Sequence, residues 1–136
     1  MDFVKSLAIA AAGLRAQAGR MRVISENIAN ADSTAQDAGG DPYRRRVVTF
    51  TSELDRALGV RLVTLGPVDT DQGDFQSRYE PGHPGADPNG IVKYPNVNTI
   101  VEMTDMREAQ RSYDANLNII GATRTMIQRT LDILRA

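Results

Sequence analysis

The sequence of 136 residues contains no cysteine, no tryptophan and a single histidine, His83. The absence of cysteine excludes a disulfide framework, a thiolate metal site and a cysteine nucleophile. A single imidazole excludes metal sites built from several histidines and leaves little room for a Ser-His-Asp triad. Aromatic residues make up only 5% of the chain, so its core must consist of aliphatic side chains. These absences argue against an enzyme, and we expect no catalytic residue, no cofactor and no metal ion.

The charge balance and the hydropathy exclude two further classes. Sixteen basic residues stand against seventeen acidic ones, which makes a dominant nucleic-acid surface unexpected. Since no apolar run approaches the roughly 18 residues of a membrane span, we also expect no direct membrane insertion. The stretch Ser6–Leu14 is similar to a signal-peptide core, but its helical pattern continues through Arg15 and Arg20. We therefore expect it to remain in the mature protein.

Helix breakers are confined to the middle of the chain. All six prolines lie between Pro42 and Pro95, and eight of the eleven glycines lie between Gly39 and Gly90. Long helices require breaker-free ends. The pattern predicts an α+β, mainly α protein with an N-terminal coiled-coil helix and its ending motif (1–34), a small β-rich, turn-rich middle (35–95) and a C-terminal coiled-coil helix (96–136).

Both ends carry a three-four apolar repeat, which predicts that the two helices pair as an antiparallel coiled coil. We expect helices over residues 2–30 and 99–134, with Thr99 and Glu102 forming a capping box. A second apolar line, Ile119, Met126 and Ile133, runs beside the C-terminal seam and suggests another packing partner. The residues expected to form the assembly seam are Leu7, Leu14, Met21, Ile28, Met103, Met106, Tyr113, Leu117, Ile120, Ile127 and Leu131.

The middle is expected to hold short strands at 43–50, 60–65, 74–80 and 91–94, the last two closing a hairpin or broad loop through Pro88-Asn89-Gly90. The run Arg44-Arg45-Arg46 is too short for a nucleic-acid site and is interpreted as an edge strand that is solvated or contacts protein. Asp69, Asp71 and Asp74 lack the spacing of a calcium loop and are expected to be solvated. The prolines and glycines around His83 predict a rigid, extended loop rather than a metal or acid-base site.

The end of the first helix carries the motif Ser25-Glu26-Asn27-Ile28-Ala29-Asn30. Asn tolerates a left-handed conformation, and Asn30 can end the helix through bonds from its side chain to the backbone. Asn27 and Asn30 share a face of the helix. They could therefore also form hydrogen bonds across to the second helix or to a neighbouring subunit.

Three motifs resemble those of bacterial flagellar axial proteins. The first, around Ile24–Asn30, resembles the S-x-x-N-I-A-N signature shared by rod and hook proteins. The segments Tyr79–Gly90 and Pro95–Met106 resemble the Y-x-P-G-H-P and P-N-V-N-x-x-x-E-M patterns of the proximal-rod family among the flagellar basal-body rod proteins. The motif residues are Ser25, Asn27, Ile28, Ala29, Asn30, Pro81, Gly82, His83, Pro84, Pro95, Asn96, Val97 and Asn98.

This resemblance implies a structural subunit of the proximal rod, located in the periplasmic part of the flagellar basal body. It implies export through the flagellar type III apparatus without a cleaved leader. It further implies assembly with copies of itself and with other rod proteins into a tube that transmits torque. An alternative from another class is a soluble helical adaptor or secretion chaperone that binds one partner through its heptads. A small hydrolase built around His83 is a third, weaker hypothesis.

Overall fold

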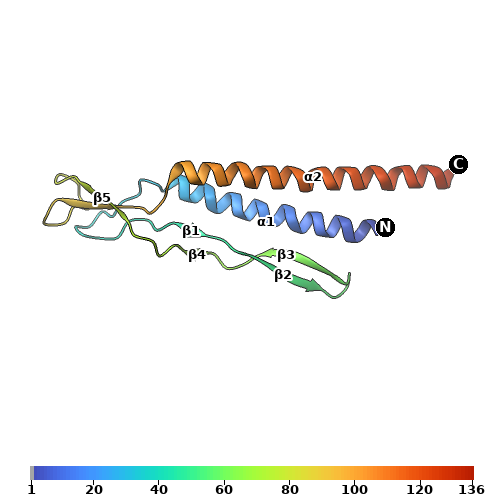
Figure 1. The fold of residues 1–136 in the computed structure, drawn as a ribbon, viewed down its shortest axis with the longest axis horizontal. Helices are drawn as coiled ribbons and strands as arrows, with labels where there is room; N and C mark the ends of the chain where they lie inside the picture. The colour runs from blue at the N-terminus through green and yellow to red at the C-terminus, as the bar shows by residue number, and fades with distance from the viewer. Residues whose placement is uncertain (1) are drawn as a thin grey trace. The chain divides into compact units, whose positions relative to one another are not determined.

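The computed structural model describes residues 2–136 and is traced in Figure 1. Within these residues the chain forms two long helices, α1 (Phe3–Ala29) and α2 (Thr99–Arg135), separated by short strands. The predicted helix bounds hold to within one residue at each end. The predicted class, α+β and mainly α with a small sheet-containing middle, is confirmed. The strands are β1 (Arg46–Val47), β2 (Phe50–Asp55), β3 (Val60–Leu65), β4 (Asp69–Thr70), β5 (Gln76–Tyr79) and β6 (Ile91–Tyr94).

The strands pair antiparallel as β1–β4, β2–β3 and β5–β6 within the described part of the chain. The predicted strands at 60–65 and 91–94 and the hairpin of 74–80 with 91–94 are confirmed. The predicted strand at 43–50 is wrong, because only Arg46 and Val47 pair there before β2 begins. Just upstream, the Tyr43 N–H donates to Ser33 O at 3.0 Å and the Arg45 N–H donates to Asn96 Oδ1 at 2.8 Å. Bonds to a loop and a side chain thus replace the strand ladder.

The chain divides into two compact units. Unit 1 contains the residues up to Met21, Thr49–Gly66 and Arg107–Ala136; unit 2 contains Arg22–Val48 and Pro67–Met106. Each helix therefore contributes one segment to each unit. None of the helices in residues 2–136 has an apolar stretch long enough to cross a membrane.

In unit 1, small residues of α1 are buried and the helix segments touch. Gly13 is buried, and a Cβ added to it would lie 2.7 Å from Oδ1 of Asn116. A guanidinium nitrogen of Arg20 lies 3.6 Å from a carboxylate oxygen of Glu108. The higher-numbered residue of α1 thus meets the lower-numbered residue of α2, so these segments run in opposite directions. Ala10, Ala12, Ala16, Ala109 and Thr123 form the rest of the buried set in this unit.

Unit 2 has a mixed apolar and polar core. Its buried apolar residues come from the end of α1, from the segment before β1, from β6 and from the segment before α2. Two polar residues, Asn27 and Glu102, are buried as completely as the apolar ones, at 1% and 0% exposure. Buried polar groups cost free energy unless they are hydrogen-bonded, so their partners determine whether this unit is stable. The buried apolar set is Val23, Ile24, Pro42, Val92, Pro95 and Val97.

Candidate functional site

The motif residue Asn27 lies at the centre of a buried hydrogen-bond network in unit 2. Its Oδ1 accepts from the Tyr43 hydroxyl at 2.8 Å and from the Arg46 N–H at 2.9 Å. Its Nδ2 donates to Arg46 O at 2.8 Å and to Glu102 Oε2 at 3.3 Å. An amide side chain offers two donors and two acceptor lone pairs, so Asn27 is fully satisfied. The expectation that Asn27 reaches the second helix is confirmed. Burial raises the pKa of the neighbouring Tyr43 hydroxyl.

The buried carboxylate of Glu102, in the first turn of α2, is paired with Arg45. Nε of Arg45 donates to Oε1 of Glu102, and Nη1 lies 3.3 Å from Oδ2 of Asp71. Burial alone would lower the pKa of Arg45, but its hydrogen bonds to Glu102 and Asp71 outweigh that effect and raise it. The interpretation of the arginine run as an edge that is solvated or contacts other proteins missed this internal ion pair.

Asn96, from the Pro-Asn-Val-Asn segment, joins the same network from another side. Its Oδ1 accepts from the Arg45 N–H, and its Nδ2 donates to Asp71 O at 3.0 Å. The pKa of the Asp71 carboxyl is lowered, first by the Gly73 N–H that donates to it at 2.8 Å and then by Arg45. Asp71 therefore belongs to a structured turn, in contrast to the solvated loop expected from the sequence. We call Asn27, Tyr43, Arg45, Asp71, Asn96 and Glu102 the polar network.

The predicted capping box of Thr99 and Glu102 is wrong. Asn98 caps α2 instead, because its Oδ1 accepts from the N–H groups of Ile100 at 3.1 Å and Val101 at 3.4 Å. The Glu102 N–H donates to Asn98 O at 3.0 Å. The carboxylate of Glu102 cannot return to the start of the helix, since it is held by Arg45 and Asn27.

At the other boundary, Asn30 ends α1 through its side chain, as predicted. Its Nδ2 and its backbone N–H both donate to Glu26 O, at 2.8 and 3.1 Å, and Ser33 Oγ donates to its Oδ1. Asn30 does not adopt the left-handed conformation that asparagine tolerates, because glycines alone have positive φ among residues 2–136. Because its N–H still bonds to the carbonyl four residues earlier, Asn30 keeps a right-handed backbone.

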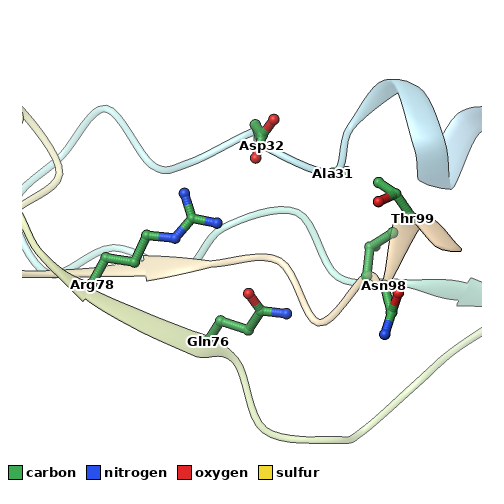
Figure 2. A pocket seen from close by; sticks show the side chains of 7 residues that line it. Ala31, Asp32, Gln76, Arg78, Asn98 and Thr99 are labelled. Carbon is green, nitrogen blue, oxygen red and sulfur yellow. The ribbon is translucent and has the colours of Figure 1, made fainter.

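A polar pocket lies in unit 2 between β5 and the segments that flank the helices (Figure 2). Arg78 and Gln76 reach into it from β5, and Asp32 lies on the opposite wall. The Arg78 guanidinium is stacked 4.1 Å from the Tyr94 ring centroid. The Tyr94 hydroxyl donates to Glu80 at 3.0 Å, which raises the pKa of that hydroxyl. The lining residues include no nucleophile next to a base; they are Ala31, Asp32, Gln76, Arg78, Val97, Asn98 and Thr99.

Two further motif residues, Ser25 and Ala29, are exposed on α1. Another four lie in the loop of His83. Pro81, Gly82 and Pro84 are exposed, whereas His83 is half-buried and bonded to Thr34 and Gly85. No group of three acidic or histidine side chains in residues 2–136 is arranged to hold a metal ion.

The residues of the expected assembly seam differ in exposure. Leu7, Leu14, Met21, Tyr113, Ile120 and Ile127 are half-buried in unit 1, and Ile28 and Met106 are half-buried in unit 2. Met103, Leu117 and Leu131 are exposed at 56%, 49% and 44%. Asn116 is half-buried and Thr123 is buried, whereas the residues that follow them, Leu117 and Arg124, are exposed. The buried line of α2 in unit 1 is thus rotated by one residue there. The role of the seam in assembly stays a prediction.

Comparison with known proteins agrees with the motifs. Residues 89–133 match the model of the family described as flagellar basal body rod FlgEFG protein C-terminal. The flagellar basal-body rod protein FlgC of Agrobacterium fabrum is 56% identical over 94% of this chain and 92% of its own length. The FlgC proteins of Salmonella typhimurium and Borreliella burgdorferi are 39% and 35% identical, over 92% and 99% of both chains. The chain therefore belongs to the flagellar basal-body rod protein FlgC family.

Proposed function

We infer that this protein is a structural subunit of the flagellar basal-body rod and that it is not an enzyme. The observation that carries this conclusion is the 56% identity with a FlgC protein along 94% of the chain. The polar network adds a physical reason, because it uses motif residues to join the end of α1 to the start of α2. Such side chains stabilise a fold and leave no reactive group free. The alternative of a soluble adaptor is not favoured.

We further propose where and how the subunit works. It belongs to the proximal part of the rod, in the periplasm, and is exported through the flagellar type III apparatus. There it joins copies of itself and other rod proteins in a helical tube that transmits torque. Residues 1–34 and 96–136 are the assembling segments, and their helices pair as an antiparallel coiled coil. Residues 35–95 form the small middle region between them.

The exposed apolar side chains of α2 support assembly through this helix. The second apolar line is open to solvent in the single chain: Ile119, Met126 and Ile133 are 49%, 45% and 75% exposed. Complete burial of such a side chain stabilises by roughly 1.5–3 kcal/mol. Covering this line and the exposed members of the seam would therefore supply several kcal/mol per subunit interface. Leu117 and Leu131 are the most exposed seam residues of unit 1, so their burial in an interface would stabilise it more than burial of the other seam residues of that unit.

Complementation tests this function directly. The chain is produced in Agrobacterium fabrum cells that lack their own FlgC, and basal bodies are purified. We expect swimming to be restored and the chain to co-purify with the rod. Leu117→Asp should abolish incorporation, whereas the exposed off-seam variant Arg15→Ala should be tolerated. A chain that stays wholly in the cytoplasm would overturn the rod assignment; normal rods with Leu117→Asp would overturn only the proposed seam.

A further inference from the structure

The chain contains seven asparagines, and only Asn89 is followed by a glycine. The side-chain amide of an asparagine can react with its own backbone: the nitrogen of the next residue attacks Cγ and expels ammonia. The residue after the asparagine controls access to that nitrogen, and a glycine, which has no Cβ, hinders the attack least. The other six asparagines are followed by alanine, valine, isoleucine, leucine or threonine. Asn89 is therefore the asparagine that an unfolded chain exposes most to this reaction.

In unit 2 the same two residues close the loop between β5 and β6. The Gly90 N–H donates to Asp87 O at 2.9 Å, which defines a β-turn with Pro88 in its second position. Because Asn89 does not have a positive φ, the turn is of type I, in which the third residue has ψ of about 0°. The Asp87 side chain bonds to both sides of this position, since its Oδ1 accepts from the N–H groups of Asn89 and Ile91, each at 2.9 Å.

This turn prevents the reaction in two ways. A five-membered ring forms only when the Gly90 nitrogen eclipses Cβ of Asn89, and tetrahedral geometry places that arrangement roughly 120° of ψ away from a type I turn. The attacking nitrogen must also lose its proton, and in the turn that proton is bonded to Asp87 O. Ring closure therefore requires that the bonds of Asp87 open first. The Asn89 side chain is exposed, but exposure alone does not allow the reaction.

The fold nevertheless requires a glycine at position 90. Gly90 is buried and has a φ of 80°, a backbone conformation that other residues rarely adopt. A Cβ added to it would lie 2.8 Å from Cε2 of Tyr79 and 3.1 Å from Cβ of Pro81. Its carbonyl accepts from the Glu80 N–H at 2.9 Å. The residue that closes the hairpin is thus the one that makes the unfolded chain reactive.

We propose that Asn89 is a site of spontaneous deamidation that is reactive in the unfolded chain and protected by the turn of residues 87–90. In the first step the bond from Gly90 N to Cγ forms, the bond from Cγ to the amide nitrogen breaks, and that nitrogen leaves as ammonia with the Gly90 proton. Water then hydrolyses the cyclic imide at either carbonyl, which gives aspartate or isoaspartate. Isoaspartate adds a methylene to the backbone, so it cannot rebuild a turn in which Gly90 is packed. This site does not depend on how the subunit assembles.

Incubation of the chain in mildly alkaline buffer, with and without guanidinium chloride, tests the site. Trypsin releases the peptide of residues 79–93, in which Asn89 is the only asparagine, so mass spectrometry follows it separately. In denaturant, Asn89 should deamidate faster than each of the other six asparagines. In native buffer its rate should fall by more than about tenfold, which corresponds to a free energy of about 1.4 kcal/mol for opening the turn. Equal rates in the two buffers would overturn the protection, and an Asn89 no faster than the other asparagines in denaturant would overturn the site.

The matched variants are Asp87→Ala and Asp37→Ala. The first removes the carboxylate that bonds to the N–H groups of Asn89 and Ile91, so Asn89 should deamidate faster in native buffer and at an unchanged rate in denaturant. The second removes an exposed carboxylate outside the turn and should leave both rates unchanged. An Asp87→Ala chain as slow as the parent in native buffer would overturn the role of the turn. The comparison of the two buffers does not depend on whether this variant folds.

The two products separate the effect of charge from that of backbone length. Asn89→Asp introduces the carboxylate without the methylene, so its Gly90 amide should stay as protected from hydrogen exchange as in the parent chain. In chains aged in denaturant, enriched in isoaspartate at position 89 and refolded, this protection should be lost. Equal protection in the two would overturn the inference that isoaspartate cannot rebuild the turn.

Discussion

Truncating Arg45 to alanine should destabilise unit 2 by about 3 kcal/mol. The substitution removes the charged partner of Glu102, whose side chain is only 1% exposed, and leaves a buried carboxylate held by Asn27 alone. Breaking one side of a buried ion pair typically costs about 3–5 kcal/mol. We expect the lower end of that range, because the Arg45 side chain is 24% exposed and water can follow it into the gap.

Two further variants separate charge from hydrogen bonding. Glu102→Gln keeps the shape of the side chain but has one acceptor oxygen where Arg45 and Asn27 need two. One buried donor is left unpaired, at a cost of about 1–3 kcal/mol. Replacing both partners with apolar residues (Arg45→Met with Glu102→Leu) should cost less than the sum of the single changes, because the double variant contains no unpaired buried charge.

Urea unfolding followed by tyrosine fluorescence measures these effects. Tyr43, Tyr79 and Tyr94 lie in unit 2, whereas the fourth tyrosine, Tyr113, lies in unit 1. All variants are therefore made in a Tyr113→Phe background, in which the emission follows unit 2 alone. The matched control is Arg46→Ala. The side chains of Arg46 and of its ion-pair partner Glu26 are 51% and 40% exposed, so this pair should contribute about 0–1 kcal/mol. If Arg45→Ala destabilised unit 2 no more than Arg46→Ala does, the polar network would not be what holds these segments together.

Four other outcomes are expected. Gly13→Ala should destabilise unit 1 by about 1–3 kcal/mol in thermal unfolding, because the new Cβ would lie 2.7 Å from Oδ1 of Asn116. Gly121→Ala, where nothing lies within 4 Å, should instead stabilise α2 by up to about 1 kcal/mol. The lowered pKa of Asp71 means that its contribution is complete above its unfolded pKa of about 3.9 and is lost as pH falls through the folded value; Asp71→Asn should therefore flatten the acid limb of a stability–pH curve. Finally, amides near the two chain ends should exchange fast in dilute monomer and slowly in assembled rods. Strong protection in the monomer would show that the helices are stable before assembly.

The elements that sequence predicts well here are those specified locally. Breaker-free ends with a three-four repeat set the bounds of α1 and α2, and alternation set β3 at Val60–Leu65. The role of the arginine run is harder to predict, because Arg45, its middle residue, forms an ion pair with Glu102, which is 57 positions away in the sequence. Neither residue carries a local sign of that pairing. The available signal is a glutamate among apolar residues in a first helical turn, and that pattern is equally typical of a cap.

The seam shows a second limit of pattern reasoning. Periodicity selects the largest apolar residues, and so it selected Leu117 rather than Asn116. In unit 1 the amide of Asn116 packs against Gly13, which has no side chain, and the neighbouring Leu117 is exposed. Which side of a helix is buried depends on the shape of what faces it. A repeat of apolar letters does not contain that information.

The bond between Asn27 and Glu102 joins residues 75 positions apart, so everything between them is a closed loop. The free energy of closing a flexible loop rises only slowly with length, by about 0.6 kcal/mol for each doubling. Extra residues inserted between these anchors would therefore add little to the cost of closure, provided that they enter at exposed turns. The anchors fix where the chain leaves one helix and re-enters the other, and the length of the path between them is left free to vary.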